Sequence, residues 1–442
     1  MEHAATWRPL SRRVFVSSIL AGVSAIPVAA AAGCGRQGTQ PAPAPKQRIE
    51  LMIWHNWGVP DPRTDYTEQV LLPRFAAEHP GLSAKIEFAG NGLAVLEKIK
   101  TNVAAGTPPD ASFVYAEWTV ALGQASAIVA LDALMAAEKG FEKSDFYPHL
   151  WEALTYNGKI WGFPQNNHPF GVFYREDLFQ KEAVQPPATW EQLVEVAKRL
   201  TRDTDGDGQI DQWAFDLGTS DTNFWNVVQQ SHGGRYLAPD RKSVAWNSEA
   251  GLRALDYYVA LFQQHRVAPL ENPPQQGFNT GKQAMTIAGP WRVDGYERNG
   301  LPVKLFPYPR GSQKAVAHAN VDTWAVLKTN PDREAAAFRF LAWYGSKEIY
   351  GDWAMRFKHA PLRKSIAQDP TYRRWLDEHP MVKAVVEMPH EIIIRPLTPV
   401  TAEINTTLAN ALRDAVQGKI SPKEALERAT AEANTQLRMA GA

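Results

Sequence analysis

The 442-residue sequence contains a single cysteine, Cys34, and no excess of charge of either sign. One cysteine excludes an internal disulfide, and it also excludes a cysteine-based zinc cluster or a redox pair within the chain. Lysine plus arginine and aspartate plus glutamate each number 47, so the formal charge is zero. A neutral chain without a basic stripe does not indicate a nucleic acid as the partner.

Long hydrophobic runs are also missing beyond residue 33. The longest candidate, residues 118–131, is interrupted by Gly123, Gln124 and Ser126, and it fits a buried helix better than a membrane span of about 20 residues. Enzyme motifs are scarce as well. The sequence has no H-E-x-x-H, P-loop or G-x-S-x-G motif, and Gly90-Asn91-Gly92 lacks the rest of a dinucleotide fingerprint.

Residues 1–33 have the pattern of an export signal, with three arginines and one glutamate followed by an uncharged run over residues 14–33. Residues 11–16, Ser-Arg-Arg-Val-Phe-Val, resemble a twin-arginine signal. Ala31-Ala32-Gly33-Cys34 resembles a bacterial lipobox, which predicts a lipid on Cys34. A membrane-spanning anchor is the alternative, but Gly22, Pro27 and many alanines make the run weakly hydrophobic.

From Cys34 onwards the formal charge is −2, because the signal removes three arginines and one glutamate. Residues 34–47 alternate proline with alanine and have no apolar period, which predicts an extended tether. The chain is expected to be soluble from residue 48 onwards and to touch the membrane only through the lipid.

Apolar periodicity beyond the tether predicts an α/β chain. Alternating or apolar runs predict strands at 49–54, 85–88 and 110–115, with helices over 67–78 and 93–105 between them, as in βαβ units. Capping signals predict three further helices, which begin after Thr189, after Asn330 and after Ser421. The C-terminus is therefore expected to be helical, and no internal repeat is present.

Several segments together resemble one known family. Residues 158–164, Gly-Lys-Ile-Trp-Gly-Phe-Pro, run on to Phe-Tyr-Arg-Glu-Asp-Leu at 173–178. This stretch resembles the "GKIYGLP…YYNKDLF" segment of the extracellular solute-binding proteins of sugar-type ABC importers, such as the maltose and multiple-sugar binding proteins. Further matches in family order lie at residues 278–285, 289–291, 306–311 and 418–426. The ordered set extends over residues 49–437.

This resemblance implies a two-lobe α/β fold of the periplasmic-binding-protein type II, with the ligand in an interlobe cleft. We expect lobe 1 to comprise residues 48–165 and 290–327, and lobe 2 to comprise residues 166–289 and 328–442. Short strands at 171–174 and 285–288 are placed where the chain would change lobes.

The resemblance also implies what the protein does. We expect a monomeric lipoprotein that captures a carbohydrate or related polyol outside the cytoplasmic membrane and delivers it to the transmembrane subunits of an ABC permease. It would use hinge closure, and no ATP site and no catalytic residue are expected. A secreted glycoside hydrolase is the alternative, since two suitably spaced carboxylates suffice for its chemistry. A non-catalytic surface adhesin is a third interpretation.

Candidate ligand contacts follow strands or stand at the expected lobe crossings, because ligands of open α/β sheets lie beyond the carboxyl ends of the strands. Indole rings suit a sugar, whose apolar faces stack on aromatic rings while its hydroxyls need planar polar partners. Core packing is the alternative, because alternation buries about half of a strand's side chains. The expected contacts are Trp54, Asn56, Trp57, Glu117, Trp118, Asn166, Asn167, Trp225, Trp291, Arg292, Asp322, Trp324 and Arg363.

An acidic loop predicts a structural calcium ion, and no other cofactor is required. Residues Asp203, Asp205, Asp207, Gln209 and Asp211 occupy positions 1, 3, 5, 7 and 9 of an EF-hand-like loop. Glycine stands at position 6, but position 12 is Ala214, so the bidentate glutamate is missing. A solvated turn rich in aspartate and glycine is the alternative.

Overall fold

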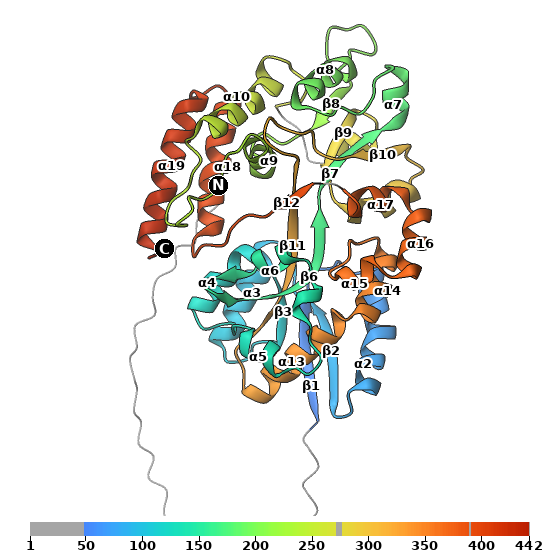
Figure 1. The fold of residues 1–442 in the computed structure, drawn as a ribbon, viewed down its shortest axis with the longest axis vertical. Coiled ribbons are helices and arrows are strands. Elements are labelled where there is room, and N and C mark those ends of the chain that lie inside the picture. The colour runs from blue at the N-terminus through green and yellow to red at the C-terminus, as the bar shows by residue number, and fades with distance from the viewer. Residues whose placement is uncertain (1–47, 271–275, 389, 442) are drawn as a thin grey trace, which may run out of the picture. The chain divides into compact units, whose positions relative to one another are not determined.

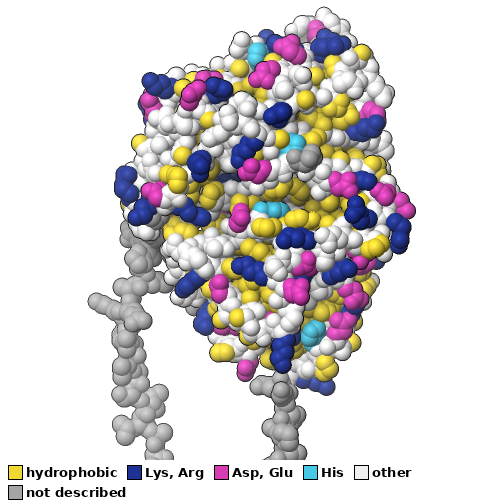
Figure 2. Space-filling view, viewed as in Figure 1, with side chains coloured by type: hydrophobic (Ala, Val, Ile, Leu, Met, Phe, Trp, Pro, Cys, Tyr) yellow, Lys and Arg dark blue, Asp and Glu magenta, His cyan; other side chains and the backbone are white. Residues whose placement is uncertain are grey.

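The computed structural model describes residues 48–270, 276–388 and 390–441. The expected export signal, the lipid-bearing Cys34 and the tether lie outside these residues. Within them, no helix is both long enough and apolar enough for a membrane span. Charged side chains of both signs are interspersed over the face shown in Figure 2, which agrees with the balanced composition.

A six-stranded mixed sheet forms the centre of lobe 1, in the order β12-β11-β3-β1-β2, with β6 paired to β11 (Figure 1). Its strands β1, β2 and β3 are parallel, as the βαβ pattern predicts, whereas β11 runs antiparallel to β3 and β6. The strands span Ile49–His55 (β1), Leu82–Phe88 (β2), Ala111–Tyr115 (β3), Phe163–Pro169 (β6), Val316–Val326 (β11) and Glu391–Ile393 (β12).

The helices expected between these strands are present. Residues 62–78 are helical throughout, but the middle turn is a π-helix. The helical elements up to β6 span Pro62–Tyr66 (α1), Thr67–Leu71 (η1), Leu72–Glu78 (α2), Leu93–Ala104 (α3), Ala116–Trp118 (η2), Thr119–Gln124 (α4), Asp132–Ala137 (α5), Lys143–Asp145 (η3) and Pro148–Glu152 (α6). A small hairpin of Thr155–Tyr156 (β4) and Lys159–Ile160 (β5) precedes β6.

A four-stranded sheet, in the order β10-β7-β9-β8, forms the centre of lobe 2. Its strands span Gly171–Arg175 (β7), Trp213–Asp216 (β8), Gln283–Ala288 (β9) and Val303–Phe306 (β10). The accompanying helices span Glu176–Lys181 (α7), Trp190–Leu200 (α8), Thr222–Ser231 (α9), Glu249–Gln263 (α10), Gln276–Asn279 (α11), Pro290–Arg292 (η4) and Val293–Arg298 (α12). The C-terminal helices Thr401–Val416 (α18) and Pro422–Met439 (α19) lie side by side and pack on α10 (Figure 1).

The capping signals are confirmed at all three helix starts. Thr189 Oγ1 accepts a hydrogen bond from Gln192 N at the start of α8, and Ser421 Oγ accepts one from Glu424 N at the start of α19. Asn330 Oδ1 accepts a hydrogen bond from Arg333 N at the start of the helix that follows it. The capping box at α8 differs from the usual one. Its Gln192 side chain accepts a hydrogen bond from the backbone N–H of Ala188 at 2.8 Å, one residue before the N-cap Thr189.

Helices between β11 and β12 require a correction of the expected lobes. They span Pro331–Tyr344 (α13), Lys347–Phe357 (α14), Lys364–Ala367 (α15), Pro370–Glu378 (α16) and Pro380–Val386 (α17). Residues from 328 onwards were assigned to lobe 2, but α13 packs on β1 and β11 of lobe 1. Its buried side chains cover a face of that sheet, and Phe338 and Trp353 lie in the same core as Leu51. Helix α17 packs on β10 of lobe 2, as expected, and α18 and α19 join the core of lobe 2.

The crossing near residue 289 is also displaced. Residues 290–306 stay in lobe 2, because β10 pairs with β7. The chain instead crosses along β11, whose first residues Val316 and Ala317 belong to the lobe 2 core while Trp324 belongs to the lobe 1 core. The first crossing lies between β6 and β7, close to the expected residue 165. The third begins with β12 and continues through residues 394–397 to α18.

Candidate functional site

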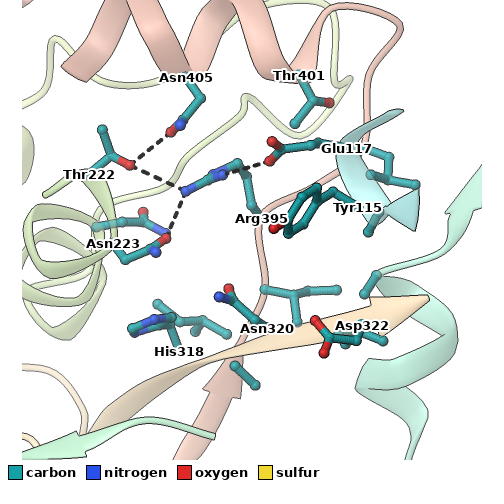
Figure 3. A pocket seen from close by; sticks show the side chains of 18 of the residues that line it. Tyr115, Glu117, Thr222, Asn223, His318, Asn320, Asp322, Arg395, Thr401 and Asn405 are labelled. Atoms are coloured by element: carbon teal, nitrogen blue, oxygen red, sulfur yellow. Dashed lines mark hydrogen bonds and ion pairs between the residues drawn. The ribbon is translucent and has the colours of Figure 1, made fainter. Parts of the chain in front are cut away.

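A cavity of about 430 Å³ lies between the two lobes, against β11 and the third crossing segment. It is lined by Tyr115, Ala116, Glu117, Ala153, Ser220, Asp221, Thr222, Asn223, Asn226, His318, Ala319, Asn320, Val321, Asp322, Ile393, Ile394, Arg395, Leu397, Thr401 and Asn405. Figure 3 shows these side chains converging from both lobes. The cavity is therefore formed by residues of both lobes and of two of the segments that connect them, β11 and the third crossing.

Local structure fixes the two walls of the cavity. Strand β3 ends at Tyr115, so the short helix η2 places Glu117 just beyond the carboxyl end of the sheet. On the other wall, Asp221 caps α9 by accepting hydrogen bonds from Asn223 N and Phe224 N, both at 3.0 Å. This cap directs Thr222 and Asn223 towards the cavity, as Figure 3 shows.

Arg395 connects the walls. Its Nη1 lies 3.3 Å from Glu117 Oε2 in lobe 1, and its Nη2 donates to Asn223 Oδ1 at 2.7 Å and to Thr222 Oγ1 at 3.3 Å in lobe 2 (Figure 3). Thr222 in turn donates to Asn405 Oδ1 of α18 at 2.8 Å. A guanidinium offers several donors in a fixed plane. The Arg395 side chain therefore connects the third crossing segment to η2 in lobe 1 and to α9 in lobe 2.

The floor of the cavity ends at a carboxylate, Asp322. Its Oδ2 accepts from His168 Nε2 at 3.0 Å and from Asn166 Nδ2 at 3.4 Å. Burial alone would raise the pKa of Asp322, but the interaction with His168, the hydrogen bonds of His168 and Asn166 and the charge of Arg63 together lower it below its ordinary value. Asp322 is therefore ionised at neutral pH.

A buried histidine forms the other end of the floor. His318 stacks on Phe170 at 4.0 Å between ring centroids, and its Nδ1 lies 3.2 Å from the Tyr308 hydroxyl. Burial, together with the charge of Arg395, lowers the pKa of His318 to about 3. The ring is therefore neutral over the physiological range of pH.

Amide side chains complete the lining. The Oδ1 atoms of Asn223, Asn226 and Asn405 all accept hydrogen bonds within the protein. Because each side-chain amide also carries two N–H donors, these asparagines can donate to a solute from lobe 2, while Glu117 and Asp322 can accept from lobe 1. A solute with many hydroxyl groups matches such a set of donors and acceptors.

Two of the thirteen expected ligand residues, Glu117 and Asp322, line the cavity. Asn166 supports Asp322 from behind. Trp291 and Arg292 are half-buried in η4, directly before α12, where the Trp291 ring contacts His168 and Phe170. Asn56 is half-buried and does not line the cavity.

The expected tryptophan stacking platform is not part of this cavity, and this corrects the interpretation of the strand-end indoles. Trp54, Trp57, Trp118 and Trp324 are at most 8% exposed and belong to the lobe 1 core, and Trp225 is fully buried in lobe 2. Trp57 packs against Trp324 and Trp353, with ring centroids 6.1 and 5.0 Å away. The position of a residue at the end of a strand does not decide whether its side chain points into the core or into the cavity.

Asn167 and Arg363 hold lobe 1 together and do not line the cavity. Asn167 Nδ2 donates to Pro361 O at 3.1 Å. Arg363 donates to Gly345 O at 2.6 Å and to Asp145 at 3.3 Å, and it is 7% exposed. Both side chains fix the loop that follows α14.

Sequence reasoning did not find Arg395, Asn223, Asn320, Asn405 or Tyr115. The Asp-Thr-Asn sequence at 221–223 is a helix-start signal that could have placed the α9 residues at an end facing the cleft. Arg395 follows a three-residue strand without a recognisable motif. Its role depends on where the third crossing lies, and only the tertiary structure shows this.

The acidic loop brings part of the expected calcium ligands together. Carboxylate oxygens of Asp203, Asp205 and Asp211 lie within 4.8 Å of one another, whereas Asp207 is outside this group. Asp203 also accepts from Gly206 N and Gly208 N at 2.7 and 2.8 Å. These backbone hydrogen bonds lower the pKa of Asp203. Both glycines have positive φ, +84° and +87°, which the turn requires.

Comparisons with known proteins agree with this architecture. The model of the family described as bacterial extracellular solute-binding protein matches residues 60–350. A putative binding protein of Brucella abortus (strain 2308) is 24% identical over 388 residues, which cover 84% of this chain and 90% of that protein.

Two solved structures share the fold. One is an ABC substrate-binding protein of Listeria monocytogenes in complex with cycloalternan, with a TM-score of 0.76 and 20% identity over 88% of this chain and 98% of that one. The other is UgpB of Mycobacterium tuberculosis in complex with glycerophosphocholine, also with a TM-score of 0.76, at 18% identity over 88% and 99% of the two chains. The expected two-lobe, type II periplasmic-binding-protein-like fold is confirmed.

Proposed function

Because this chain belongs to the bacterial extracellular solute-binding proteins, we propose that it captures a carbohydrate or related hydroxylated solute and delivers it to the transmembrane subunits of an ABC permease. The observation that carries this proposal is the interlobe cavity of about 430 Å³, lined by carboxylates, asparagine amides and Arg395. Two solved structures of the same fold are in complex with cycloalternan and with glycerophosphocholine. Both of these ligands are rich in oxygen atoms.

The charge state of the carboxyl groups favours binding over hydrolysis. A glycoside hydrolase needs one carboxyl with a raised pKa as the general acid, opposite an ionised partner. The pKa of Asp322 is lowered, and Glu117 is engaged by Arg395. Burial raises the pKa of Asp221, but its carboxyl caps α9 through two backbone N–H groups.

Hinge closure supplies the mechanism. A solute that contacts Glu117 and Asp322 on one side and Asn223 and Asn405 on the other stabilises the closed form, because only that form offers both walls at once. The three crossing segments absorb the rotation. The permease would then recognise the liganded protein by the relative position of its lobes.

Titration calorimetry with a panel of sugars, polyols and glycerol phosphodiesters tests this proposal. The variant Asn405→Ala removes an amide that lines the cavity from α18, and its matched control Asn410→Ala removes an exposed amide from the same helix. We expect Asn405→Ala to weaken binding at least tenfold and Asn410→Ala to leave it unchanged. Equal effects of the two variants, or heat only from peptides and amino acids, would contradict the proposal.

We further propose that the mature protein begins at Cys34 and is anchored by lipid, a modification motivated by the lipobox at residues 31–34. Mass spectrometry of membrane-extracted protein should show that residues 1–33 are absent and that acyl chains add mass. An unmodified Cys34 within an intact N-terminus would contradict lipidation. Replacing Arg12 and Arg13 by lysine should block export if the twin-arginine route is used.

A further inference from the structure

The charges that line the cavity do not cancel. Glu117 and Arg395 form one ion pair at 3.3 Å and offset each other. Asp221 lies at the capped end of α9 with a raised pKa, and its carboxyl is engaged by two backbone N–H groups. This leaves the carboxylate of Asp322, and its one ion-pair partner among the described residues is His168.

The Asp322 side chain is ionised. Although burial raises its pKa, the interaction with His168, the hydrogen bonds of His168 and Asn166 and the charge of Arg63 together lower it. His168 Nε2 and Asn166 Nδ2 both contact Oδ2, at 3.0 and 3.4 Å. The other oxygen, Oδ1, has no hydrogen-bond partner in the described part of the chain, so it is available to a solute in the cavity.

Polar side chains lie along the whole floor of the cavity, but the chemical groups at its two ends are different. His318, Asn320 and Asp322 are alternate residues of β11, so their side chains lie on one face of the strand over about 13 Å, at about 3.3 Å per residue. Figure 3 shows the three in a row beneath Arg395 and Tyr115. A solute lying on this strand contacts different chemistry at each end.

His318 is a hydrogen-bond donor to the cavity. Across the described residues, the Tyr308 hydroxyl has a hydrogen bond only to His318 Nδ1, so the most economical arrangement is that this hydroxyl donates and the imidazole proton lies on Nε2. That Nε2 has no partner among the described residues, and the His318 side chain is 4% exposed while it lines the cavity. This end of the floor therefore requires an oxygen acceptor.

Tyr115 completes the opposite end. It is the residue directly across from Asp322 in the antiparallel pairing of β3 and β11, so both side chains project from the same face of the sheet. Tyr115 is 37% exposed and lines the cavity. An aromatic face beside an ionised carboxylate attracts cations, through the ring quadrupole as well as through the charge.

We propose that the solute carries a cationic nitrogen, which lies against Asp322 and Tyr115, while its oxygen atoms accept hydrogen bonds from His318 and Arg395. This inference rests on the proposed function and specifies the chemical class of the solute within it. Both a protonated amino sugar and a quaternary ammonium compound have this chemistry, and the experiment distinguishes them.

Calorimetry on matched solutes tests the inference. One arm compares D-glucosamine and D-galactosamine with their N-acetyl derivatives and with the parent hexoses, and the other compares glycerophosphocholine with glycerol 3-phosphate. We expect the cationic member of at least one arm to bind at least tenfold more tightly than its neutral or anionic counterparts. If neutral sugars bind and no cationic solute binds more tightly, the inference is overturned while the proposed function stands. If none of these solutes gives heat while another neutral sugar or polyol does, the inference is overturned as well, and if only peptides and amino acids give heat, the proposed function fails too.

The variant Asp322→Asn removes the charge and keeps the shape and the hydrogen-bond acceptor of the side chain. It should lower the preference for the cationic solute at least fivefold, whereas the control Asp377→Asn, at an exposed residue of α16, should not alter it. If Asp322→Asn does not fold, the salt dependence of the unmodified protein decides. Raising sodium chloride from about 50 mM to about 500 mM should weaken binding of the cationic solute alone. Equal weakening of the neutral solute would overturn the inference.

Discussion

Arg395 Nη1 lies 3.3 Å from Glu117 Oε2, and this ion pair joins the third crossing segment to lobe 1 across the cavity. The same guanidinium reaches Thr222 and Asn223 of lobe 2. The side chains of Arg395 and Glu117 are 19% and 32% exposed. A solute in the cavity can therefore form hydrogen bonds with either side chain in place of this ion pair. Arg395 is therefore the side chain whose replacement should affect binding most directly.

We expect Arg395→Ala to weaken solute binding by about 1.5–3 kcal/mol, the usual contribution of hydrogen bonds to a charged group. Replacing it by lysine should restore only part of this loss, because an ammonium cannot donate to both lobes in one plane. Calorimetry measures the loss, with Arg373→Ala, an exposed arginine of α16, as the control. Full affinity in Arg395→Ala would show that the solute does not contact this side chain.

A partly buried ion pair should contribute to the stability of lobe 1. Arg333 Nε and Nη2 donate to the two oxygens of Asp110 at 2.7 and 2.6 Å, and Asp110, which is 2% exposed, also accepts from Met52 N. Asp110→Ala removes the acceptor of Met52 N and the partner of a guanidinium that is 35% exposed, and it should lower the free energy of unfolding by about 1–3 kcal/mol. The exposed pair Lys423–Glu427 is the control, and Glu427→Gln should cost less than about 0.5 kcal/mol. Urea denaturation measures both values.

Trp57 provides a test of whether the strand-end indoles contribute to stability or to binding. It is 3% exposed among Trp324 and Trp353 in the core. Trp57→Ala should therefore destabilise the protein by about 3–5 kcal/mol and leave the solute affinity of the folded fraction unchanged. Urea denaturation and calorimetry together distinguish the two effects. A loss of affinity with unchanged stability would return Trp57 to the ligand site.

The acidic loop should respond to calcium if the ion binds there. With one carboxylate fewer than an EF-hand, we expect a dissociation constant of about 10⁻⁴ M. Calcium at about 100 times this concentration then adds about 2.7 kcal/mol of stability. Asp203→Asn and Asp211→Asn should abolish the effect on the melting temperature, whereas Asp207→Asn, outside the cluster of three, should retain it. Identical melting curves in calcium and in chelator would mean that the loop is only a turn.

Two buried histidines predict a loss of stability in mild acid. Burial, together with the charge of Arg395, lowers the pKa of His318 to about 3. Burial, partly offset by the charge of Asp61, lowers that of His55 to about 4. In the unfolded chain both have a pKa of about 6.5. The unfolded state therefore binds more protons below that pH, and the free energy of unfolding falls as the pH falls from 6.5 towards 4.

At pH 5 each histidine should cost about 2 kcal/mol relative to pH 7, since one pKa unit corresponds to about 1.4 kcal/mol. Urea denaturation at several pH values measures this dependence. In His318→Gln the slope of stability against pH should decrease by the equivalent of about one proton. An unchanged slope would mean that His318 titrates normally in the folded protein.

The sequence by itself determined the features that depend on neighbouring residues. Hydrophobic periodicity located β1, β2, β3 and α3, and the capping signals at Thr189, Asn330 and Ser421 located three helix starts. These predictions are confirmed because a strand's alternation and a helix cap involve residues only a few positions apart. The family segments, such as residues 158–164, also identified the two-lobe fold, because the order of matches along the chain is a property of the sequence alone.

Only the tertiary structure decided which lobe each segment joins and which side chains face the cleft. An amphipathic helix such as α13 has the same pattern whichever sheet it covers, so its packing on β1 and β11 was not readable from periodicity. A tryptophan at a strand end can turn into the core or out of it, and Trp57 turns inward. Arg395 and Glu117 are 278 residues apart, and they meet because the third crossing passes the carboxyl end of β3. No local pattern encodes that contact, since it depends on the path of the chain through both lobes.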